Sequence, residues 1–527
     1  MPVLLAVFLV AGMVIGTRMR PVGKKQSLFI YPRTDKLNTI LNYIQSEYVD
    51  SVDRNHLVET AIPAILRELD PHSIYIPARD LQAINEPLEG NFEGIGVSFN
   101  MPDDTVVIIS TISGGPSEKV GIMAGDRIVS INDTLVAGIK YSQEKVVGML
   151  KGPRGTTVKV GIKRPGTRNI LDFTIVRDKI PLYSVDVSYM VDDEIGYVKI
   201  SKFAKTTLEE FNAAVEKLKT LGMKKFILDL RNNNGGYMDA ATNIADQFLG
   251  DNQLIVYTEG RARPRVNIMS KPGGNCLDEE VVVLIDEWTA SASEILAGAI
   301  QDNDRGLIIG RRSFGKGLVQ EPIVLNDGSA LRLTIARYYT PTGRSIQKPY
   351  TRGREDFYYN DINIRYENGE FMEKDSIEFN DSLKFYTPEG KTVYGGGGIM
   401  PDIFIPLDTS GITPYFIEVR NTGLIYRFAF DYSDKEREKL KTFEHWQDLD
   451  RYLDTRDLYR QFIAFAEQKG IRGNLHDKKI SREVINVQLK AYIVRNIFDN
   501  EGFFPILHRI DNTFLKSVEI LQAEKRE

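Results

Sequence analysis

The sequence is poor in the residues that build most cofactor sites and many catalytic sites. Cys276 is the only cysteine among 527 residues, which excludes an intrachain disulfide and zinc sites made from several cysteines. The histidines are His56, His72, His445, His476 and His508. None lies between residues 73 and 444, so a serine nucleophile in that stretch needs another base, and a lysine is the expected one. No metal or other cofactor is expected.

The sequence also lacks an excess of charge of either sign. It has 67 Lys and Arg against 72 Asp and Glu, a formal net charge of −5 at pH 7. Because no basic tract is interleaved with aromatic residues, binding to nucleic acid is not expected. The hydrophobic content of 42% and the charged content of 26% are ordinary for a globular protein. The length predicts about two to four domains.

The N-terminus carries an uncharged stretch of apolar and small residues over 3–16, followed by Thr17-Arg18-Met19-Arg20. This stretch is short for a membrane span and fits the apolar part of a secretion signal. We expect a signal-anchor within residues 1–20 and a periplasmic or otherwise extracytoplasmic protein held at the inner membrane. The basic residues after the stretch favour the opposite orientation, which a start codon assigned too far downstream would explain. A buried N-terminal helix is the alternative.

Changes of pattern divide the first half of the chain. Residues 30–85 have apolar positions at helical spacing and predict an N-terminal helical segment, which ends where Pro71 stops the helix. Residues 88–178 hold short β-rich runs between turn residues, the first of them a strand over 94–99, and one helix near 142–150. This region predicts a compact β-rich domain.

The second half begins with strands and helices in alternation over 182–410, the pattern of an α/β core. Within it, residues 350–394 are polar and without periodicity, which indicates an insertion, and the four glycines at 395–398 favour a flexible linker over a direct role. Residues 412–527 are mostly helical. The sequence therefore predicts an α+β multidomain protein with a mixed α/β core, an inserted β-rich domain and helical N- and C-terminal regions.

A serine at the start of a helix is the first candidate for chemistry. The run Thr289-Ala290-Ser291-Ala292-Ser293-Glu294 follows a predicted strand over 281–285 and opens an apolar helix. A helix N-terminus offers unpaired N–H groups, and the N–H of Ala292 would face an acyl oxyanion formed at Ser291. The same run contains the capping box S-x-x-E, which explains the motif without catalysis and is the commoner case.

Lys316 is the second candidate, in a segment that nearly matches the phosphate-binding loop G-x-x-x-x-G-K-[ST]. Gly317 stands where that loop needs a hydroxyl, and the β-formers and proline at 318–325 leave no helix to follow, so nucleotide binding is not expected. A lysine in a solvated turn is the simple interpretation. A general base must be neutral and therefore desolvated, and the flanking glycines would permit close packing around such an amine.

Two glycine turns are further candidates. Residues 228–236 run a hydrophobic strand into a polar turn, where the N–H of Gly235 or Gly236 would supply a second oxyanion donor; as an ordinary strand-to-helix turn it needs no function. Residues 92–99 place a Gly-x-Gly loop before an edge strand. Such a loop can bind a chain-terminal carboxylate while the peptide adds as an extra strand, although the motif alone is weak.

Taken in order, these motifs resemble the carboxy-terminal processing proteases, the S41 type of serine peptidase with an embedded PDZ domain. The resemblance extends from about residue 35 to 410. The matching runs are Leu69-Asp70-Pro71-His72-Ser73, Gly94-Ile95-Gly96-Val97, Gly121 to Ile128, Thr289 to Glu294, Phe314-Gly315-Lys316-Gly317 with Gln320, Ala336 to Pro341 and Gly343-Arg344-Ser345-Ile346. Thr289 stands where the family usually has serine, and Asn234 where it usually has proline.

The resemblance implies a ClpP/crotonase-like protease core that uses a Ser-Lys dyad. Ser291 would be the nucleophile, Lys316 the general base and Gln320 the residue that orients the lysine. The oxyanion donors would be the N–H of Ala292 and one N–H of the pair Gly235 and Gly236.

The resemblance also implies how substrates are recognised. Ile95, Gly96 and Val97 would bind the C-terminus of the substrate, a protein with an apolar, loosely folded tail that is cut near or within that tail. Self-association into a homo-oligomer is left open. The alternative is a PDZ adaptor that binds tails without cutting them, which the intact Ser291 and Lys316 argue against.

Overall fold

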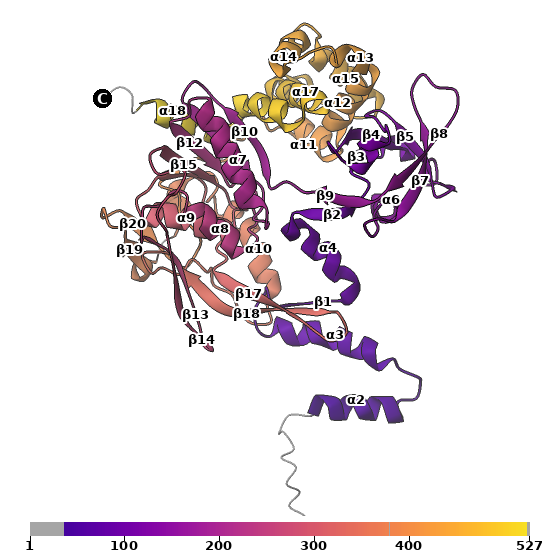
Figure 1. Ribbon diagram of the computed structural model, residues 1–527. Coiled ribbons are helices and arrows are strands. Elements are labelled where there is room, and N and C mark those ends of the chain that lie inside the picture. Colours follow the sequence, from indigo (N-terminus) through magenta and orange to yellow (C-terminus); the bar gives the residue numbers. More distant parts are fainter. Residues whose placement is uncertain (1–35, 379, 524–527) are drawn as a thin grey trace, which may run out of the picture. The chain divides into compact units, whose positions relative to one another are not determined.

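The structure is a computed structural model that describes residues 36–378 and 380–523 (Figure 1). The chain divides into two compact units between Ile65 and Leu66. The signal-anchor expected within residues 1–20 lies outside the described residues. Within the described ranges, every helix is too short or too polar to cross a membrane.

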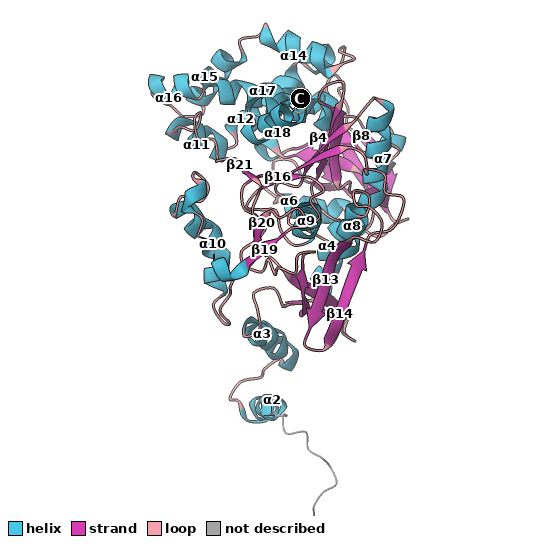
Figure 2. Ribbon diagram, turned by 90° about the vertical axis from the view of Figure 1, so that its left-hand side faces the viewer, coloured by secondary structure: helices cyan, strands magenta, loops and turns pink. Residues whose placement is uncertain are grey.

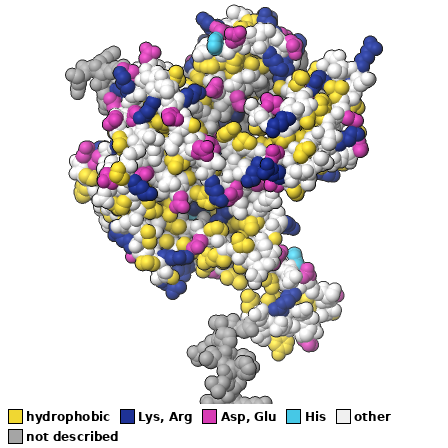
Figure 3. Space-filling model, viewed as in Figure 1, with side chains coloured by type: hydrophobic (Ala, Val, Ile, Leu, Met, Phe, Trp, Pro, Cys, Tyr) yellow, Lys and Arg dark blue, Asp and Glu magenta, His cyan; other side chains and the backbone are white. Residues whose placement is uncertain are grey.

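The first unit contains helix α2 (Lys36–Glu47) and most of helix α3 (Arg54–Arg67). The guanidinium of Arg54 donates to the side-chain oxygens of Asn42 and Asn38, at 2.9 and 3.0 Å, and so ties the two helices together. Large apolar side chains of α2 stay exposed, and Figure 3 shows apolar side chains on the surface of this unit. The two helices bury little apolar surface, since Leu41 is the buried residue of α2 and Leu66 that of α3.

A β-rich domain opens the second unit. Helix α4 (Ala78–Glu89) leads into a two-stranded ribbon of β2 (Asn91–Gly94) and β9 (Asp178–Pro181), which connects the domain to the rest of the unit. The domain's sheet has the strands β3 (Val97–Asn100), β4 (Val106–Thr111), β5 (Arg127–Ile131), β6 (Thr134–Leu135), β7 (Thr157–Lys163) and β8 (Leu171–Val176). The helices are α5 (Pro116–Lys119) and α6 (Gln143–Leu150), close to the expected helix near 142–150.

The single strand predicted over 94–99 was wrong in one respect. The strand is interrupted between β2 and β3, where Gly96 has φ of 72°. The Ile95 carbonyl oxygen accepts hydrogen bonds from the N–H and the hydroxyl of Ser117 instead of pairing within the sheet. A glycine is needed there because other residues rarely adopt positive φ. The break turns Val97 into the first residue of an edge strand.

The α/β core has a six-stranded sheet in the order β10-β11-β12-β15-β16-β21, with all neighbours parallel except β10 and β11. The strands are β10 (Val185–Met190), β11 (Ile195–Ile200), β12 (Lys225–Asp229), β15 (Glu280–Ile285), β16 (Leu307–Gly310) and β21 (Ile403–Phe404). Helices α7 (Thr207–Thr220), α8 (Met238–Ala245) and α9 (Ala292–Asp302) cover one face, and α18 (Asn512–Ala523) contributes Phe514 and Leu521 to the other. Both faces are buried, as expected for parallel strands.

A second, antiparallel sheet carries the loop that holds Lys316. Its strands are β1 (Ile74–Ile76), β18 (Ala330–Tyr339), β13 (Leu254–Gly260), β14 (Arg263–Met269) and β17 (Leu318–Val324). β18 is paired on one side with β17 and on the other with β1 and β13. This double pairing fixes the side chains that β18 presents.

Residues 350–394 contain a helix that the sequence did not indicate, α10 (Glu355–Glu367), and the hairpin β19 (Lys384–Tyr386) and β20 (Thr392–Tyr394). Tyr358 of α10 packs edge-on against Phe314, and the amine of Lys348 lies 3.8 Å from the Phe314 ring centroid. Residues 350–394 therefore pack against Phe314, in the loop that carries Lys316.

The four glycines at 395–398 do not form the flexible linker that the sequence favoured. The N–H of Gly396 donates to Ser345 and that of Gly398 to Ile346, and a Cβ at Gly398 would lie 2.7 Å from the Ser313 carbonyl oxygen. The absence of side chains lets this segment pack directly on the loop before Lys316.

The C-terminal region is helical, as predicted, and its helices gather into one group in Figure 2. They are α11 (Pro414–Asn421), α12 (Leu424–Lys435), α13 (Arg437–Leu440), α14 (Trp446–Asp454), α15 (Leu458–Gln468), α16 (Leu475–Ile480) and α17 (Arg482–Leu507). They enclose their own apolar core. Asp434 of α12 forms a 2.6 Å ion pair with Arg127 of the β-rich domain.

Candidate active site

Ser291 lies in a strained turn between strand β15 and helix α9. Its backbone has φ of 56° and ψ of −117°, a combination that costs a residue with a side chain on the order of 1–3 kcal/mol. The strain turns Ser291 toward a cavity, which it lines together with Ala292 at the first position of the helix. Strained residues of this kind gather at functional sites.

Glu294 holds this turn and the Lys316 loop together. Its fully buried carboxylate accepts the N–H of Ser291 at 2.9 Å, which is one half of the expected capping box. It also accepts the Ser313 hydroxyl at 2.5 Å and the N–H groups of Gly315 and Lys316 at 2.7 and 2.8 Å. Burial raises the pKa of Glu294, while these hydrogen bonds favour the charged form.

Tyr338 is a second link between Ser291 and Lys316. Its hydroxyl lies 3.0 Å from the Ser291 carbonyl oxygen and 2.5 Å from the Lys316 carbonyl oxygen. Because one Tyr338 hydroxyl contacts both carbonyl oxygens, it keeps the two carbonyls near each other. The backbones that carry the candidate nucleophile and the candidate base are therefore held by Glu294 on one side and Tyr338 on the other.

The amine of Lys316 is largely removed from water. Burial first, and then the positive charge of Arg332, lowers the pKa of Lys316 to about 8. The amine donates to the side-chain oxygen of Gln320 at 3.3 Å, and the Gln320 nitrogen donates to the His72 carbonyl oxygen at 2.5 Å. A substantial fraction of Lys316 is thus neutral near pH 8, as a general base must be.

The glycine turn after β12 approaches Ser291 closely. A Cβ at Gly235, where φ is 102°, would lie 2.8 Å from the Ser291 Cβ and 3.0 Å from the Ala292 nitrogen. The N–H of Gly235 donates to the Asn233 side chain at 2.9 Å. Among the described residues, the N–H groups of Ala292 and Gly236 have no such partner.

Ser291, Ala292, Gly235, Gly236, Lys316 and Gln320 line one cavity of about 390 Å³. The structure thus brings together all the residues that the sequence placed at the reacting centre. Within the described part of the chain, no hydrogen bond joins the Ser291 hydroxyl to the Lys316 amine. Catalytic hydrogen bonds are often long before substrate binds, so this geometry is compatible with a dyad.

The other predicted site residues, Ile95, Gly96 and Val97, lie in the β-rich domain and do not line the cavity. They surround the break between β2 and β3, at the end of an edge strand. An edge strand leaves one row of backbone groups free to pair with an added peptide. No group of three or more His, Cys, Asp or Glu side chains in the described ranges is arranged to hold a metal ion.

Sequence reasoning missed three contributors to the site. Glu294 was recognised only as a cap, Tyr338 only as part of a family run, and Arg332 not at all. The positions of all three depend on contacts between elements that lie far apart in sequence. The one available signal was Glu294, whose place in the T-A-S-A-S-E run already linked it to the serine.

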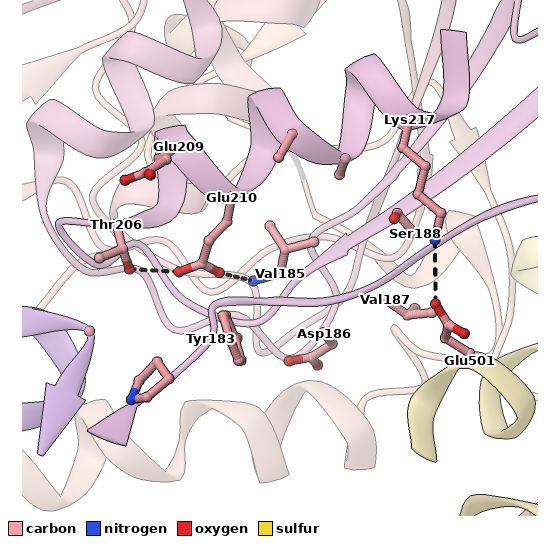
Figure 4. Close-up of a pocket in the computed structure, with 14 residues that line it drawn as sticks. Tyr183, Val185, Asp186, Val187, Ser188, Thr206, Glu209, Glu210, Lys217 and Glu501 are labelled. Carbon is pink, nitrogen blue, oxygen red and sulfur yellow. Dashed lines mark hydrogen bonds and ion pairs between the residues drawn. The ribbon is translucent and has the colours of Figure 1, made fainter. Parts of the chain in front are cut away.

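A second and larger cavity, of about 570 Å³, lies between α7 and the edge strand β10 (Figure 4). The carboxylate of Glu210 accepts the N–H of Val185 at 2.9 Å and the Thr206 hydroxyl at 2.6 Å. Lys217 and Glu501 form a 3.3 Å ion pair across it. This groove holds no residue that the sequence singled out.

Comparison with known proteins agrees with this architecture. Residues 194–353 match peptidase family S41, residues 94–175 match the PDZ domain, and residues 415–499 match a family of unknown function, DUF8443. The first two cover the core around Ser291 and the β-rich domain. The third covers most of the C-terminal helices.

The chain is 37% identical over 346 residues to a carboxy-terminal-processing protease of Bartonella bacilliformis. The matched region covers 65% of this chain and 78% of that protein. It is 35% identical over 328 residues to the carboxy-terminal processing protease CtpA of Bacillus subtilis, covering 62% and 69%. The solved structure of a photosystem II D1 C-terminal processing protease matches 59% of this chain and 83% of its own, at 31% identity and a TM-score of 0.35. The chain belongs to the carboxy-terminal processing proteases of peptidase family S41, and it is a serine-type peptidase with a PDZ domain.

Proposed function

We propose that the protein cleaves proteins near or within their C-terminal tails by means of a dyad of Ser291 and Lys316. The observation that carries this proposal is the double link of Glu294 and Tyr338, which holds a strained serine and a desolvated lysine at one cavity. No histidine lines that cavity. Neutral Lys316 is then the base that supports nucleophilic attack.

In the proposed reaction, Lys316 takes the hydroxyl proton as the Ser291 oxygen attacks the scissile carbonyl carbon. The carbonyl oxygen becomes an oxyanion that the N–H groups of Ala292 and Gly236 stabilise. Protonated Lys316 gives its proton to the leaving amine, and an acyl-enzyme remains. Lys316 next takes a proton from water, whose oxygen attacks the acyl carbon, and returns that proton to the Ser291 oxygen as the new carboxyl terminus is released.

Substrate capture is assigned to the PDZ domain. Ile95, Gly96 and Val97 would bind the carboxylate and last residues of an apolar tail, which would pair with the free edge of β3. Cleavage of a quenched peptide with such a tail tests the activity. The Ser291→Ala variant should lose cleavage entirely, and an active Ser291→Ala variant would exclude the proposed nucleophile.

We propose that the protein works outside the cytoplasm, anchored by its N-terminal segment. The support is the uncharged stretch at residues 3–16. Proteinase treatment of spheroplasts should degrade the full-length protein while a cytoplasmic marker survives. Protection of the protein until the cells are lysed would contradict this location.

A further inference from the structure

Arg332 lies beside the catalytic cavity and has no ion-pair partner in the part of the chain that the structure describes. It lies on strand β18, is half-buried, and lines the cavity that contains Ser291 and Lys316. Within the described ranges its guanidinium forms no ion pair or side-chain hydrogen bond. A guanidinium has five N–H donors and stays charged, so a half-buried one normally finds an acceptor.

The other half-buried and buried arginines of the core all have partners: Arg305 donates to backbone carbonyl oxygens, and the rest have carboxylate partners. Their ion pairs are Arg231 with Asp229 and Asp511, Arg311 with Glu287, Arg312 with Glu370, Arg344 with Asp302, and Arg365 with Glu370, at N–O distances of 2.5–3.2 Å. These pairs hold the core together. Arg332 departs from this pattern, and it does so at the cavity that Ser291 and Lys316 also line.

The lining of the cavity explains why Arg332 stays unpaired. It includes two cations, Lys316 and Arg332, and no Asp or Glu. The charge of Asp70 acts on Lys316. The Asp70 carboxylate accepts hydrogen bonds from the N–H groups of His72 and Ser73 at 2.8 and 2.9 Å and from the Thr334 hydroxyl at 3.1 Å. The cavity lining therefore offers Arg332 no carboxylate partner, while the charges of Glu294 and Asp70 act on Lys316 from outside the lining.

Arg332 is also held in place by its strand. Its backbone is opposite Ile74 of β1 on one side and Pro322 of β17 on the other. Pro322 and Gln320 line the same cavity. Pairing on both sides fixes the backbone from which the Arg332 side chain extends, so that part of the site need not be ordered by a ligand.

We propose that Arg332 binds a carboxylate of the substrate next to the bond that is cut, and so makes the cavity select acidic cleavage sites. This inference rests on the proposed function, because it gives that same site a specificity. A planar guanidinium and a carboxylate pair through two parallel hydrogen bonds, which a neutral amide does not match. The carboxylate comes either from an Asp or Glu side chain or from the chain terminus.

Matched quenched peptides test the proposal. One series exchanges Glu for Gln at each position flanking the cut, and another exchanges a free C-terminal acid for an amide. The wild-type protein should prefer the carboxylate member at one position by about 10- to 100-fold in kcat/KM. Preference in the first series identifies a side chain, and preference in the second identifies the chain terminus.

The decisive variant is Arg332→Gln, assayed at about pH 9.5, well above the Lys316 pKa of about 8, so that loss of the Arg332 charge does not alter the state of the base. It should lose the preference, because kcat/KM for each carboxylate peptide should fall to the level of its neutral counterpart. Arg332→Glu should prefer a lysine at the same position. Arg337→Gln, which removes an exposed arginine from the same strand, is the matched control and should keep the preference.

Two results would overturn the inference. One is a wild-type protein that cuts the peptides without favouring a carboxylate at any position. The other is an Arg332→Gln variant that slows carboxylate and neutral peptides equally, since Arg332 would then act only through folding or through Lys316. A wild-type protein that cuts no peptide at all would instead contradict the proposed function, so the two failures are distinguishable.

Discussion

The groove between α7 and β10 and the catalytic cavity differ in how their polar groups are paired. In the groove between α7 and β10, Glu210 is bound to backbone N–H groups, Lys217 to Glu501, and the Asp186 carbonyl to Asn500. In the smaller catalytic cavity, the guanidinium of Arg332 and the N–H groups of Ala292 and Gly236 have no partner among the described residues. Uncommitted groups and a strained backbone therefore mark the active site, whereas volume does not.

The largest effect should come from the nucleophile and its base. Ser291→Ala and Lys316→Ala should each lower kcat/KM by about 10³-fold or more, because each removes one half of a unit. Glu209→Gln, in the other groove, should leave peptide cleavage within twofold of wild type. Thermal unfolding confirms that each variant is folded, and a strong loss in Glu209→Gln would mean that the groove takes part in the reaction.

Two glutamates with the same kind of partners sharpen the comparison. Glu294→Gln places an amide against N–H donors in a fully buried site and should cost about 2–4 kcal/mol of unfolding free energy, with nearly complete loss of activity. Glu210→Gln disrupts similar bonds in the half-buried groove and should cost about 1 kcal/mol. Urea unfolding measures both, and equal losses would show that burial is not the cause.

The pH dependence of cleavage should report Lys316. Its pKa is about 8, and only the neutral amine accepts a proton, so kcat/KM for a neutral peptide should fall below pH 8 by about tenfold for each pH unit. Substitution of carboxylates in the α7–β10 groove should not change this fall in kcat/KM below pH 8. A rate that is constant from pH 6 to pH 9 would exclude Lys316 as the base.

The smallest effect should come from Gln320, which touches the base without accepting its proton. Gln320→Ala should lower kcat/KM by about tenfold, since Lys316 loses a 3.3 Å contact but stays buried. Gln320→Glu should move the acidic limb of the pH profile upward, because a negative charge beside Lys316 raises its pKa. A downward movement would place Gln320 elsewhere than beside the amine.

Features that depend on local sequence were predicted, and features that depend on contacts between distant segments were not. Strands such as β12 and β15 and helix α9 were predicted because their periodicity is local, and Ser291 and Lys316 stood in recognisable runs. The strain at Ser291 and the four bonds of Glu294 were not predicted, since they arise only when β15 and the Lys316 loop meet. Helix α10 was missed because the residues it buries, Tyr358, Ile362 and Arg365, include only one aliphatic side chain, so their helical spacing gives a weak apolar pattern.

The glycines at 395–398 illustrate the same limit. A run of glycines is typical of a flexible linker, and nothing local distinguishes that from a segment packed against Ser313. The choice between Gly235 and Gly236 as oxyanion donors depended instead on a local contact, the hydrogen bond from the Gly235 N–H to the Asn233 side chain two residues earlier.

Covalent labelling tests the central claim most directly. A fluorophosphonate should add one label to the protein, located by peptide mapping on Ser291, and the label should be absent from Ser291→Ala and strongly slowed in Lys316→Ala. Ser293→Ala removes the neighbouring hydroxyl, which donates to the Asn233 carbonyl at 2.9 Å, and should still be labelled. Labelling at Ser293, or at a rate that Lys316→Ala leaves unchanged, would contradict the Ser291–Lys316 dyad.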